Sequence, residues 1–335
     1  MIPRRAVAAL LERERPWAWW RGAPWALDPV RRLPLPSGAA VVGVGGATLG
    51  GSGKTPLAIA LAGALVSRGH RVALVGHGYR SDVRGRAREV GPTSSVAEVG
   101  DEALIAAWAL AGRAAVVVGR SRAEALTFAA GLASVVIVDG LLQAHPASLA
   151  YSVLALDASG PWGSGRVFPF GDLLVRRERL EDLADGRVLV GGAECPAAGR
   201  LAAPLPHGTR VALVSTMARP ERFARSAAGL GVEALFHVKR PDHEPIAPFE
   251  LRRLRRLALA HRLDAWCIDA KTEAHLSPWG GRPLGAPAVP LLHWVAPSAS
   301  ILDRIEAALT TRARRAAAGA PAAAAVALSG SIRAR

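Results

Sequence analysis

A glycine-rich stretch ahead of an alanine-rich segment is where chemistry can first be assigned in this sequence. Residues 45–70 read GGATLGGSGKTPLAIALAGALVSRGH. Glycines at a strand-to-helix turn let backbone N–H groups converge on phosphate oxygens, a lysine reaches the β- and γ-phosphates, and a hydroxyl binds Mg²⁺. These needs are met by Gly50, Gly51, Gly53, Lys54 and Thr55. The stretch therefore predicts a nucleotide-phosphate loop whose threonine is a metal ligand.

The loop departs from its commonest form at one position, where Thr48 replaces the first glycine. The plainest alternative is a glycine-rich turn that carries a lysine by chance. Against it, only three of the 42 Lys and Arg residues are Lys, namely Lys54, Lys239 and Lys271. A lysine in so arginine-rich a chain indicates a place that needs a compact ammonium. We expect phosphate contacts along the whole loop, which comprises Thr48, Leu49, Gly50, Gly51, Ser52, Gly53, Lys54 and Thr55.

Elsewhere, acidic and imidazole side chains occur in short polar segments. Asp101 lies in VGDE, Asp139 in VIVDG and His243 in RPDHEP. Taken alone, an Asp after Gly is often a helix N-cap and a His before Glu-Pro is often an exposed loop residue. A GTPase is excluded, because its guanine-reading Asn-Lys-x-Asp motif needs asparagine and the chain has none.

Composition limits the kinds of partner and compartment that are expected. A chain of 335 residues, half of them apolar, is long enough for two packed domains. Its net charge of +15 indicates an anionic partner. We expect no nucleic acid, since the basic residues are dispersed and only two Tyr and six Phe are available for base stacking. The two Cys residues are not spaced as metal ligands, and so few cysteines suit the reducing cytoplasm. No apolar run reaches the ~18 residues of a membrane span.

The N-terminal segment, residues 1–35, combines tryptophan with arginine. Four of the nine Trp stand within RPWAWWRGAPW, namely Trp17, Trp19, Trp20 and Trp25. Indole rings favour the lipid headgroup boundary and arginine pairs with lipid phosphate, so the segment is typical of an anchor on an anionic membrane surface. The alternative is a helix that packs its indoles on the protein's own core.

Short apolar runs alternate with alanine-rich helical segments. The runs cover residues 39–46, 71–79, 114–120, 134–140 and 152–158, and a second set covers 210–216, 232–238, 265–270 and 289–295. This alternation predicts an α/β protein with a parallel sheet covered by helices on both faces. We place a P-loop domain at 36–205, bounded by the Pro-rich stretch 195–208. A smaller α/β domain at 206–312 would close the active site, and a disordered tail would follow at 313–335.

Several segments, in chain order, resemble the tetraacyldisaccharide 4′-kinase family, which phosphorylates the lipid A precursor. The loop TLGGSGKTP resembles that family's loop, non-glycine first position included. It is followed by RGHRVALVGHGYR, VGDEALI, VVVGRSR, VIVDGLLQAH, GSGRVFPFGDL, ARPERF and RPDHEP. The resemblance covers roughly residues 35–300. It implies a P-loop NTPase-like fold and transfer of the ATP γ-phosphate to the 4′-hydroxyl of a tetraacyldisaccharide 1-phosphate.

The resemblance also implies roles for residues and partners. Asp101 corresponds to the presumed base, His243 to its partner from the second domain, and Lys54 to the phosphate-binding lysine. ATP and Mg²⁺ are the implied cofactors, with Thr55 and Asp139 on the metal. The implied partners are the acylated disaccharide 1-phosphate and an anionic membrane surface. The implied place is the cytoplasmic face of the inner membrane, as a peripheral protein, and no protein partner can be inferred.

The chain also departs from the family. Val138 replaces the first of two adjacent aspartates, so we expect weaker Mg²⁺ binding, which Val138→Asp would strengthen. Residues 76–79 lack an arginine that the family has there. Leu174-Val175 stands where the family has Arg-Glu, unless the alignment is shifted so that residues 177–178 take that place. Residues 269–272 also differ from the family's Thr-Glu-Lys-Asp. The longer spacing after Asp139 leaves Gln143 and His145 unplaced. Two alternatives therefore stay open: a weak or inactive nucleotide-binding relative, and a P-loop ATPase acting on a small metabolite.

Overall fold

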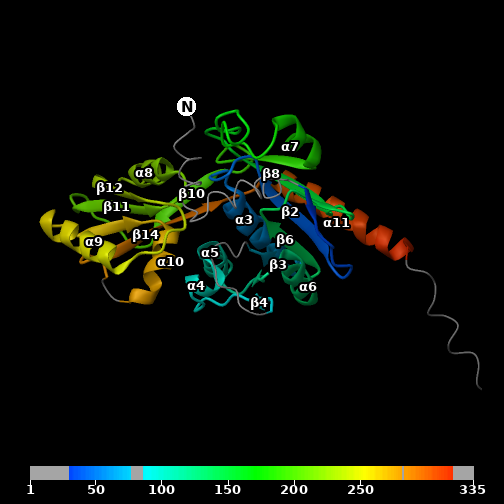
Figure 1. Ribbon diagram of the computed structural model, residues 1–335, viewed down its shortest axis with the longest axis horizontal. Helices are drawn as coiled ribbons and strands as arrows, with labels where there is room; N and C mark the ends of the chain where they lie inside the picture. The colour runs from blue at the N-terminus through cyan, green and yellow to red at the C-terminus, as the bar shows by residue number, and fades with distance from the viewer. Residues whose placement is uncertain (1–29, 77–85, 281–282, 320–335) are drawn as a thin grey trace, which may run out of the picture.

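The protein forms two α/β domains, described by a computed structural model over residues 30–76, 86–280 and 283–319 (Figure 1). Their two sheets lie side by side along the long axis of the molecule. The first domain is built on a seven-stranded sheet of order β4-β5-β3-β6-β2-β8-β9. Its strands are β2 (Ala40–Gly46), β3 (Val72–Val75), β4 (Arg88–Glu89), β5 (Ala115–Val118), β6 (Val135–Asp139), β8 (Tyr151–Asp157) and β9 (Gly186–Val190). All neighbours are parallel except β4 and β5.

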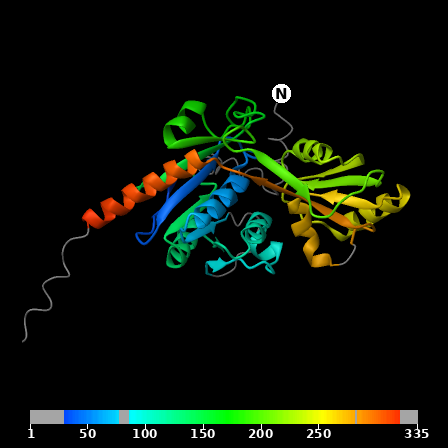
Figure 2. The same ribbon diagram turned by 180° about the vertical axis from the view of Figure 1, so that it is seen from behind.

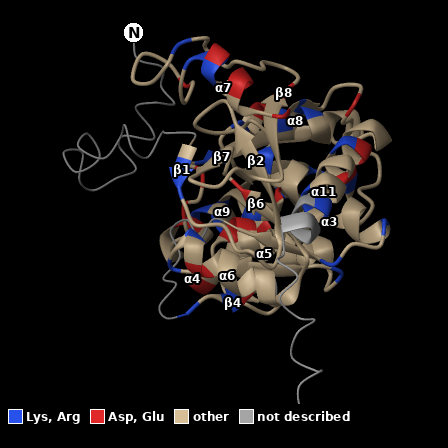
Figure 3. Ribbon diagram, turned by 90° about the vertical axis from the view of Figure 1, so that its right-hand side faces the viewer, with Lys and Arg blue, Asp and Glu red and all other residues tan. Residues whose placement is uncertain are grey.

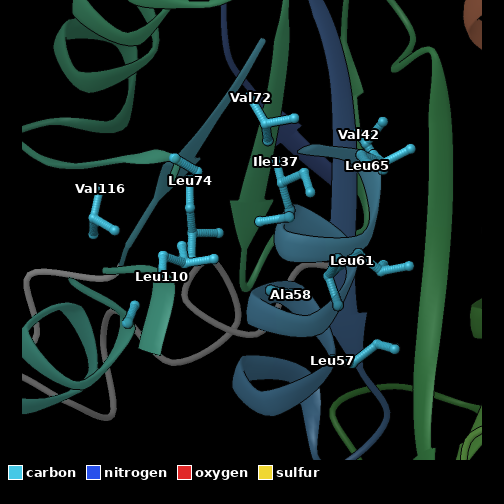
Figure 4. Close-up of a cluster of buried hydrophobic side chains, with 14 of the residues drawn as sticks. Val42, Leu57, Ala58, Leu61, Leu65, Val72, Leu74, Leu110, Val116 and Ile137 are labelled. Carbon is cyan, nitrogen blue, oxygen red and sulfur yellow. The ribbon is translucent and has the colours of Figure 1, made fainter. Parts of the chain in front are cut away.

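Alternate residues of the central strands enter two separate cores, because successive side chains of a strand point to opposite faces. On one face Val42, Leu74 and Ile137 pack against three helices, α3 (Lys54–Ser67), α5 (Asp101–Leu110) and α11 (Ala299–Gly319). Figure 4 shows Leu57, Leu61 and Leu65 of α3 meeting these strands. On the other face lies α6 (Arg122–Leu132). Each fully buried leucine stabilises the fold by about 1.5–3 kcal/mol.

The second domain has a five-stranded sheet of order β10-β14-β13-β11-β12. Its strands are β10 (Ala197–Leu201), β11 (Val211–Thr216), β12 (Ala234–Arg240), β13 (Ala265–Ile268) and β14 (Ala288–Val295). Helix α8 (Pro220–Gly229) buries Phe223 on one face, and α9 (Pro248–Ala260) buries Leu254 against Trp266 on the other. The short α10 (Ala270–Leu276) leads into a 3₁₀ turn (Ser277–Trp279) and contacts α5 of the first domain.

The predicted α/β fold is confirmed, whereas the expected domain limits differ from the structure in two places. The Pro-rich stretch 195–208 contains β10, which pairs antiparallel with β14, so it belongs to the second sheet. Helix α11 returns to the first domain, where Ile305 is fully buried (Figures 1 and 2). The division at 205/206 is therefore wrong for both segments. A sequence period of 3.6 shows that a helix has an apolar stripe but not which sheet will cover it.

The two ends of the chain also differ from expectation. Helix α11 continues to Gly319, so residues 313–319 are not part of a disordered tail. At the other end β1 (Val30–Arg32) pairs with β7 (Gln143–His145), and Leu33 is buried. Residues 30–35 therefore belong to the first domain. Residues 1–29, with the four predicted anchor tryptophans, lie outside the described residues.

Smaller elements complete the first domain, namely α4 (Val96–Val99) and α7 (Arg177–Leu183). On the side seen in Figure 3, acidic stretches of α4 and α7 lie among basic ones. Within the described part of the chain, no helix combines the length and apolar character needed to cross a membrane.

Candidate active site

The glycine-rich loop turns tightly between β2 and α3. A Cβ on Gly46 would lie 2.2 Å from Ser52 Oγ, so the strand end needs glycine there. Gly53 has φ +82°, a left-handed conformation that glycine adopts without strain. It precedes Lys54, the first residue of α3, and no side chain caps this helix. The uncapped helix start and the positive end of the helix dipole are together suited to bind an anion.

Thr55 and Asp139 face one another at the helix start. Thr55 Oγ1 donates a hydrogen bond to Asp139 Oδ2 at 2.6 Å, and Val44 beside the loop pairs with Asp139 in the sheet. Asp139 Oδ1 is buried and has no hydrogen-bond partner among the described residues. Burial raises the pKa of this carboxyl, with the ammonium of Lys54 acting in the opposite direction. An orphaned carboxylate oxygen beside a hydroxyl is a donor set that fits Mg²⁺.

Val138 lies on the other side of β6. Its side chain is fully buried against Val41, Val75 and Val117 in the core that α6 covers. This position counts against the expectation that an aspartate here would strengthen Mg²⁺ binding. The physical reason is the strand period of two, which turns residue 138 away when residue 139 faces the loop.

A carboxylate–imidazole pair joins the two domains. Asp101 is the first residue of α5, and His243 lies in the loop after β12 with φ 61°. His243 Nδ1 is 2.9 Å from Asp101 Oδ1 and 3.0 Å from Oδ2. Burial works to raise the pKa of Asp101, yet the contacts of His243 and His275 hold it well below its usual range. Asp101 is thus an ionised, 3% exposed carboxylate that can accept a proton.

The helix-cap interpretation of Asp101 is wrong, because the N-cap of α5 is Gly100 and Asp101 is the first helical residue. Asp101 Oδ1 accepts the backbone N–H of Glu102 at 2.7 Å, so the carboxylate that contacts the imidazole is also bound to the start of the helix. His243, which could have been an exposed loop residue, has a side chain only 16% exposed.

Further charged groups surround this pair, and the sequence patterns did not identify them as part of the site. Lys271 Nζ of α10 is 2.7 Å from Asp242 Oδ1 and 3.4 Å from Glu102 Oε1. His275 Nε2, one turn further along α10, is 3.4 Å from Asp101 Oδ2. Burial works to raise the pKa of Glu102, but the ammonium groups of Lys271 and Lys54 lower it, and the effect of Lys54 links this cluster to the loop. The scarcity of lysine was the signal that could have singled out Lys271.

Arg240 supports the loop that carries His243. Its 3% exposed side chain donates to the carbonyls of Glu244 and Pro245 at 3.0 and 2.9 Å. It also donates to both carboxylate oxygens of Glu250, at 3.2 and 3.0 Å, and to Thr216 Oγ1 at 3.0 Å. These five contacts fix residues 241–247 on the end of the second sheet.

A second contact between the domains lies at the glycine-rich loop. Arg219, before α8, forms a buried ion pair with Asp157 at the end of β8. Arg222 Nη1 donates to the carbonyl of Gly51 at 3.3 Å. A Cβ on Gly51 would lie 2.6 Å from Arg219 Nε, so the arginine covers the glycine closely. The second domain therefore touches both the phosphate loop and Asp101.

Comparison with known proteins places this chain in a family. The sequence profile described as tetraacyldisaccharide-1-P 4′-kinase matches residues 29–206. A tetraacyldisaccharide 4′-kinase from Anaeromyxobacter dehalogenans is 35% identical over 81% of this chain and 78% of its own length. The chain belongs to the tetraacyldisaccharide 4′-kinase family. A relative with the same name from Alkalilimnicola ehrlichii is 36% identical over 66% of this chain and 70% of its own length.

A solved structure of this family has the same fold. LpxK from Aquifex aeolicus, crystallised in complex with ATP, matches with a TM-score of 0.59 at 20% identity. The match covers 86% of this chain and 93% of that chain. At this identity the likeness concerns the fold, which is a P-loop domain with a second α/β domain.

The remaining departures from the kinase family fall at different distances from the loop. Leu174 N donates to the carbonyl of Ala47 at 2.9 Å, so this segment lies against the loop with a leucine where the family pattern has an arginine. Arg177, the alternative, is 53% exposed and pairs with Glu181 on α7. Gln143 Oε1 accepts the backbone N–H groups of residues 144 and 149, which is a structural role. His77 and Tyr79 lie outside the described residues.

Arg122, at the start of α6, is a buried cation that sequence reasoning did not single out. Burial lowers the pKa of its guanidinium to about 10, while Asp139 opposes the shift. Its Nη1 has no hydrogen-bond partner among the described residues. A buried guanidinium near Asp139 adds positive charge to the edge of the sheet where the loop lies.

Proposed function

We propose that this kinase transfers the γ-phosphate of ATP to the 4′-hydroxyl of a tetraacyldisaccharide 1-phosphate, with Asp101 as the group that receives the hydroxyl proton. The observation that supports this proposal most directly is the contact of Asp101 with His243 between the two domains, 2.9 Å from Oδ1 to Nδ1. A base must be ionised to accept a proton, and the lowered pKa keeps Asp101 ionised, at the cost of making the carboxylate a weaker base.

The phosphate loop supplies binding and positive charge in this proposal. Backbone N–H groups of residues 48–55 bind the phosphates, and Lys54 neutralises charge on the β- and γ-groups. Thr55 and Asp139 would hold Mg²⁺, which when bound draws electron density from the phosphate oxygens. With one carboxylate and one hydroxyl, the ion keeps its other positions for phosphate and water, as Mg²⁺ commonly does.

His243 holds Asp101 in place and stabilises its charge through Nδ1. Because His243 and Asp101 come from different domains, the pair forms only when the domains are together. Closure of this kind excludes water from the reacting phosphate, which would otherwise be lost to hydrolysis.

The acceptor's acyl chains remain in a bilayer, so we place the kinase at an anionic membrane surface on the cytoplasmic face of the inner membrane. The support is the sequence of residues 1–29, with its four Trp among Arg4, Arg5, Arg15 and Arg21. Each basic residue near an anionic surface contributes about 1 kcal/mol, which suffices for reversible attachment.

The direct test incubates the protein with ATP, Mg²⁺ and tetraacyldisaccharide 1-phosphate in detergent, and detects the bisphosphorylated lipid by mass spectrometry. We expect product from the natural chain and a loss of about 100-fold or more in Asp101→Asn, the scale of general-base catalysis. Asp303→Asn is the matched control, because Asp303 is 66% exposed and pairs only at the surface with Arg68.

Two other results would contradict the proposal. Retained ATP binding without lipid product would mean a relative that has lost the transfer step. Equal turnover by Asp101→Asn and the natural chain would remove Asp101 from the reaction.

A further inference from the structure

Lys271 makes contact with the far nitrogen of the imidazole that holds Asp101. Its Nζ lies 3.1 Å from His243 Nε2, while His243 Nδ1 faces the two Asp101 oxygens at 2.9 and 3.0 Å. An ammonium has only N–H donors, so Nε2 must present its lone pair to Lys271. A carboxylate accepts, so Nδ1 must carry the proton. We propose that Lys271 fixes His243 as the neutral, Nδ1-protonated tautomer and is thereby a positioning residue for the Asp101–His243 pair.

The charges around His243 show why Lys271 decides the outcome. Asp101 and Glu102 of α5, Asp242 of the same loop and Lys271 of α10 all face the His243 ring. His275, also on α10, contacts Asp101. Nε2 is 3.6 Å from Asp242 Oδ2 and 3.8 Å from Glu102 Oε1. These carboxylates would attract a second proton to the ring. Lys271 is closer to both, at 2.7 Å from Asp242 Oδ1 and 3.4 Å from Glu102 Oε1, and neutralises them.

The tautomer matters for the reaction, and here the inference rests on the proposed function. A neutral His243 leaves the pair with one negative charge, so Asp101 keeps its capacity to accept the hydroxyl proton. An imidazolium would form an ion pair with Asp101 and weaken it as a base. Lys271 therefore keeps the imidazole beside Asp101 neutral, while its own positive charge acts to lower the pKa of Asp101.

The positive charge of Lys271 is the property that this role needs. Lys271→Met removes the charge and keeps the aliphatic stem, and we expect the acid limb of kcat/KM to move to higher pH by about one unit or more. Turnover near pH 6.5 should then fall about tenfold and recover toward pH 8.5, because one unit of displacement is a factor of ten. The KM for ATP should stay within about twofold, since the contacts described for Lys271 are with Glu102, Asp242 and His243 and not with the loop.

Lys271→Arg separates charge from packing. Arginine also carries only donors, so the acid limb should stay within about half a pH unit of the natural protein even where kcat is lower. Lys239→Met is the matched control. Lys239 is another of the three lysines, but it is 52% exposed and pairs with Glu221 on the surface.

The tautomer can be read without turnover by NMR of protein labelled with ¹⁵N-histidine, using His243→Gln to assign the signal. We expect the natural protein and Lys239→Met to show a protonated Nδ1 and an unprotonated Nε2 at pH 7. Lys271→Met should show both nitrogens protonated. An Nε2-protonated or doubly protonated ring in the natural protein would overturn the inference, as would an unchanged spectrum and pH profile in Lys271→Met.

The resting spectrum also separates this inference from the proposed function. A chain that shows the expected tautomer but makes no lipid product would contradict the function and leave the role of Lys271 standing. If Lys271→Met does not fold, the spectrum of the natural protein and the pH profile of Lys271→Arg still decide.

Discussion

Replacing Val138 by aspartate sets the family pattern against the structure of this chain. The family carries two adjacent aspartates, so the sequence alone favours a gain in Mg²⁺ binding. The structure places the side chain at 138 in a fully buried valine cluster on the face opposite Asp139. We therefore expect Val138→Asp to lose stability and to leave the Mg²⁺ concentration for half-maximal activity unlowered.

The size of the loss follows from the pH at which the new carboxyl ionises. In the unfolded chain an aspartate has a pKa of about 3.9, whereas a fully buried one can be raised by about 3–5 units. At pH 7 the folded protein would hold a proton that the unfolded chain has released. Three pH units at 1.36 kcal/mol each give a loss of about 4 kcal/mol, which shrinks to about 1.5 kcal/mol at pH 5.

The sign is the useful part of this prediction. Between the unfolded and the raised folded pKa, the folded state binds the extra proton, so stability falls as pH rises. Urea unfolding followed by circular dichroism at pH 5, 6 and 7 measures this slope. Val138→Asn is the matched control, because it buries a similar polar group that does not titrate. Equal losses for both variants at every pH, together with a lower Mg²⁺ requirement in Val138→Asp, would refute the reasoning, since the carboxylate would then be reaching the metal.

Five more variants test Lys54, Arg240 and the N-terminal segment. Lys54→Ala and Lys54→Arg should both lose most turnover, while their melting temperatures stay equal to that of the natural protein. A planar guanidinium cannot replace an ammonium between two phosphates. Near-normal rates in the arginine variant would contradict this phosphate site. Arg240→Met should lower stability by about 3–5 kcal/mol, because it leaves the partly buried Glu250 unpaired, and Arg240→Lys should recover only part of it; thermal unfolding measures both, and an unchanged melting temperature would remove the support assigned to Arg240. Removal of residues 1–29 should weaken sedimentation with anionic vesicles and slow turnover of bilayer-embedded acceptor while ATP affinity stays constant. Ending the deletion before Val30 spares β1 and its pairing with β7, and equal sedimentation of the two proteins would instead favour tryptophans packed on the core.

Local chemistry was accessible from the sequence because it depends on residues that are neighbours in the chain. The glycine positions, Lys54 and Thr55 act within one turn, and their spacing is enough to predict a phosphate loop between a strand and a helix. The apolar runs likewise located the main strands to within a few residues, since a strand buried on both faces must be apolar throughout. The order of several such segments then indicated the family.

Long-range partners were decided only by the tertiary structure. Asp101 and His243 are 142 positions apart, and from the sequence only the resemblance to the family indicated that they act together. Nothing local in Lys271 says that it will meet His243, nor in β10 that it will pair with β14. The face of Val138 and the return of α11 to the first domain have the same origin. An apolar side chain or a strand edge is satisfied by any suitable partner, and which partner is met is fixed by how the whole chain packs.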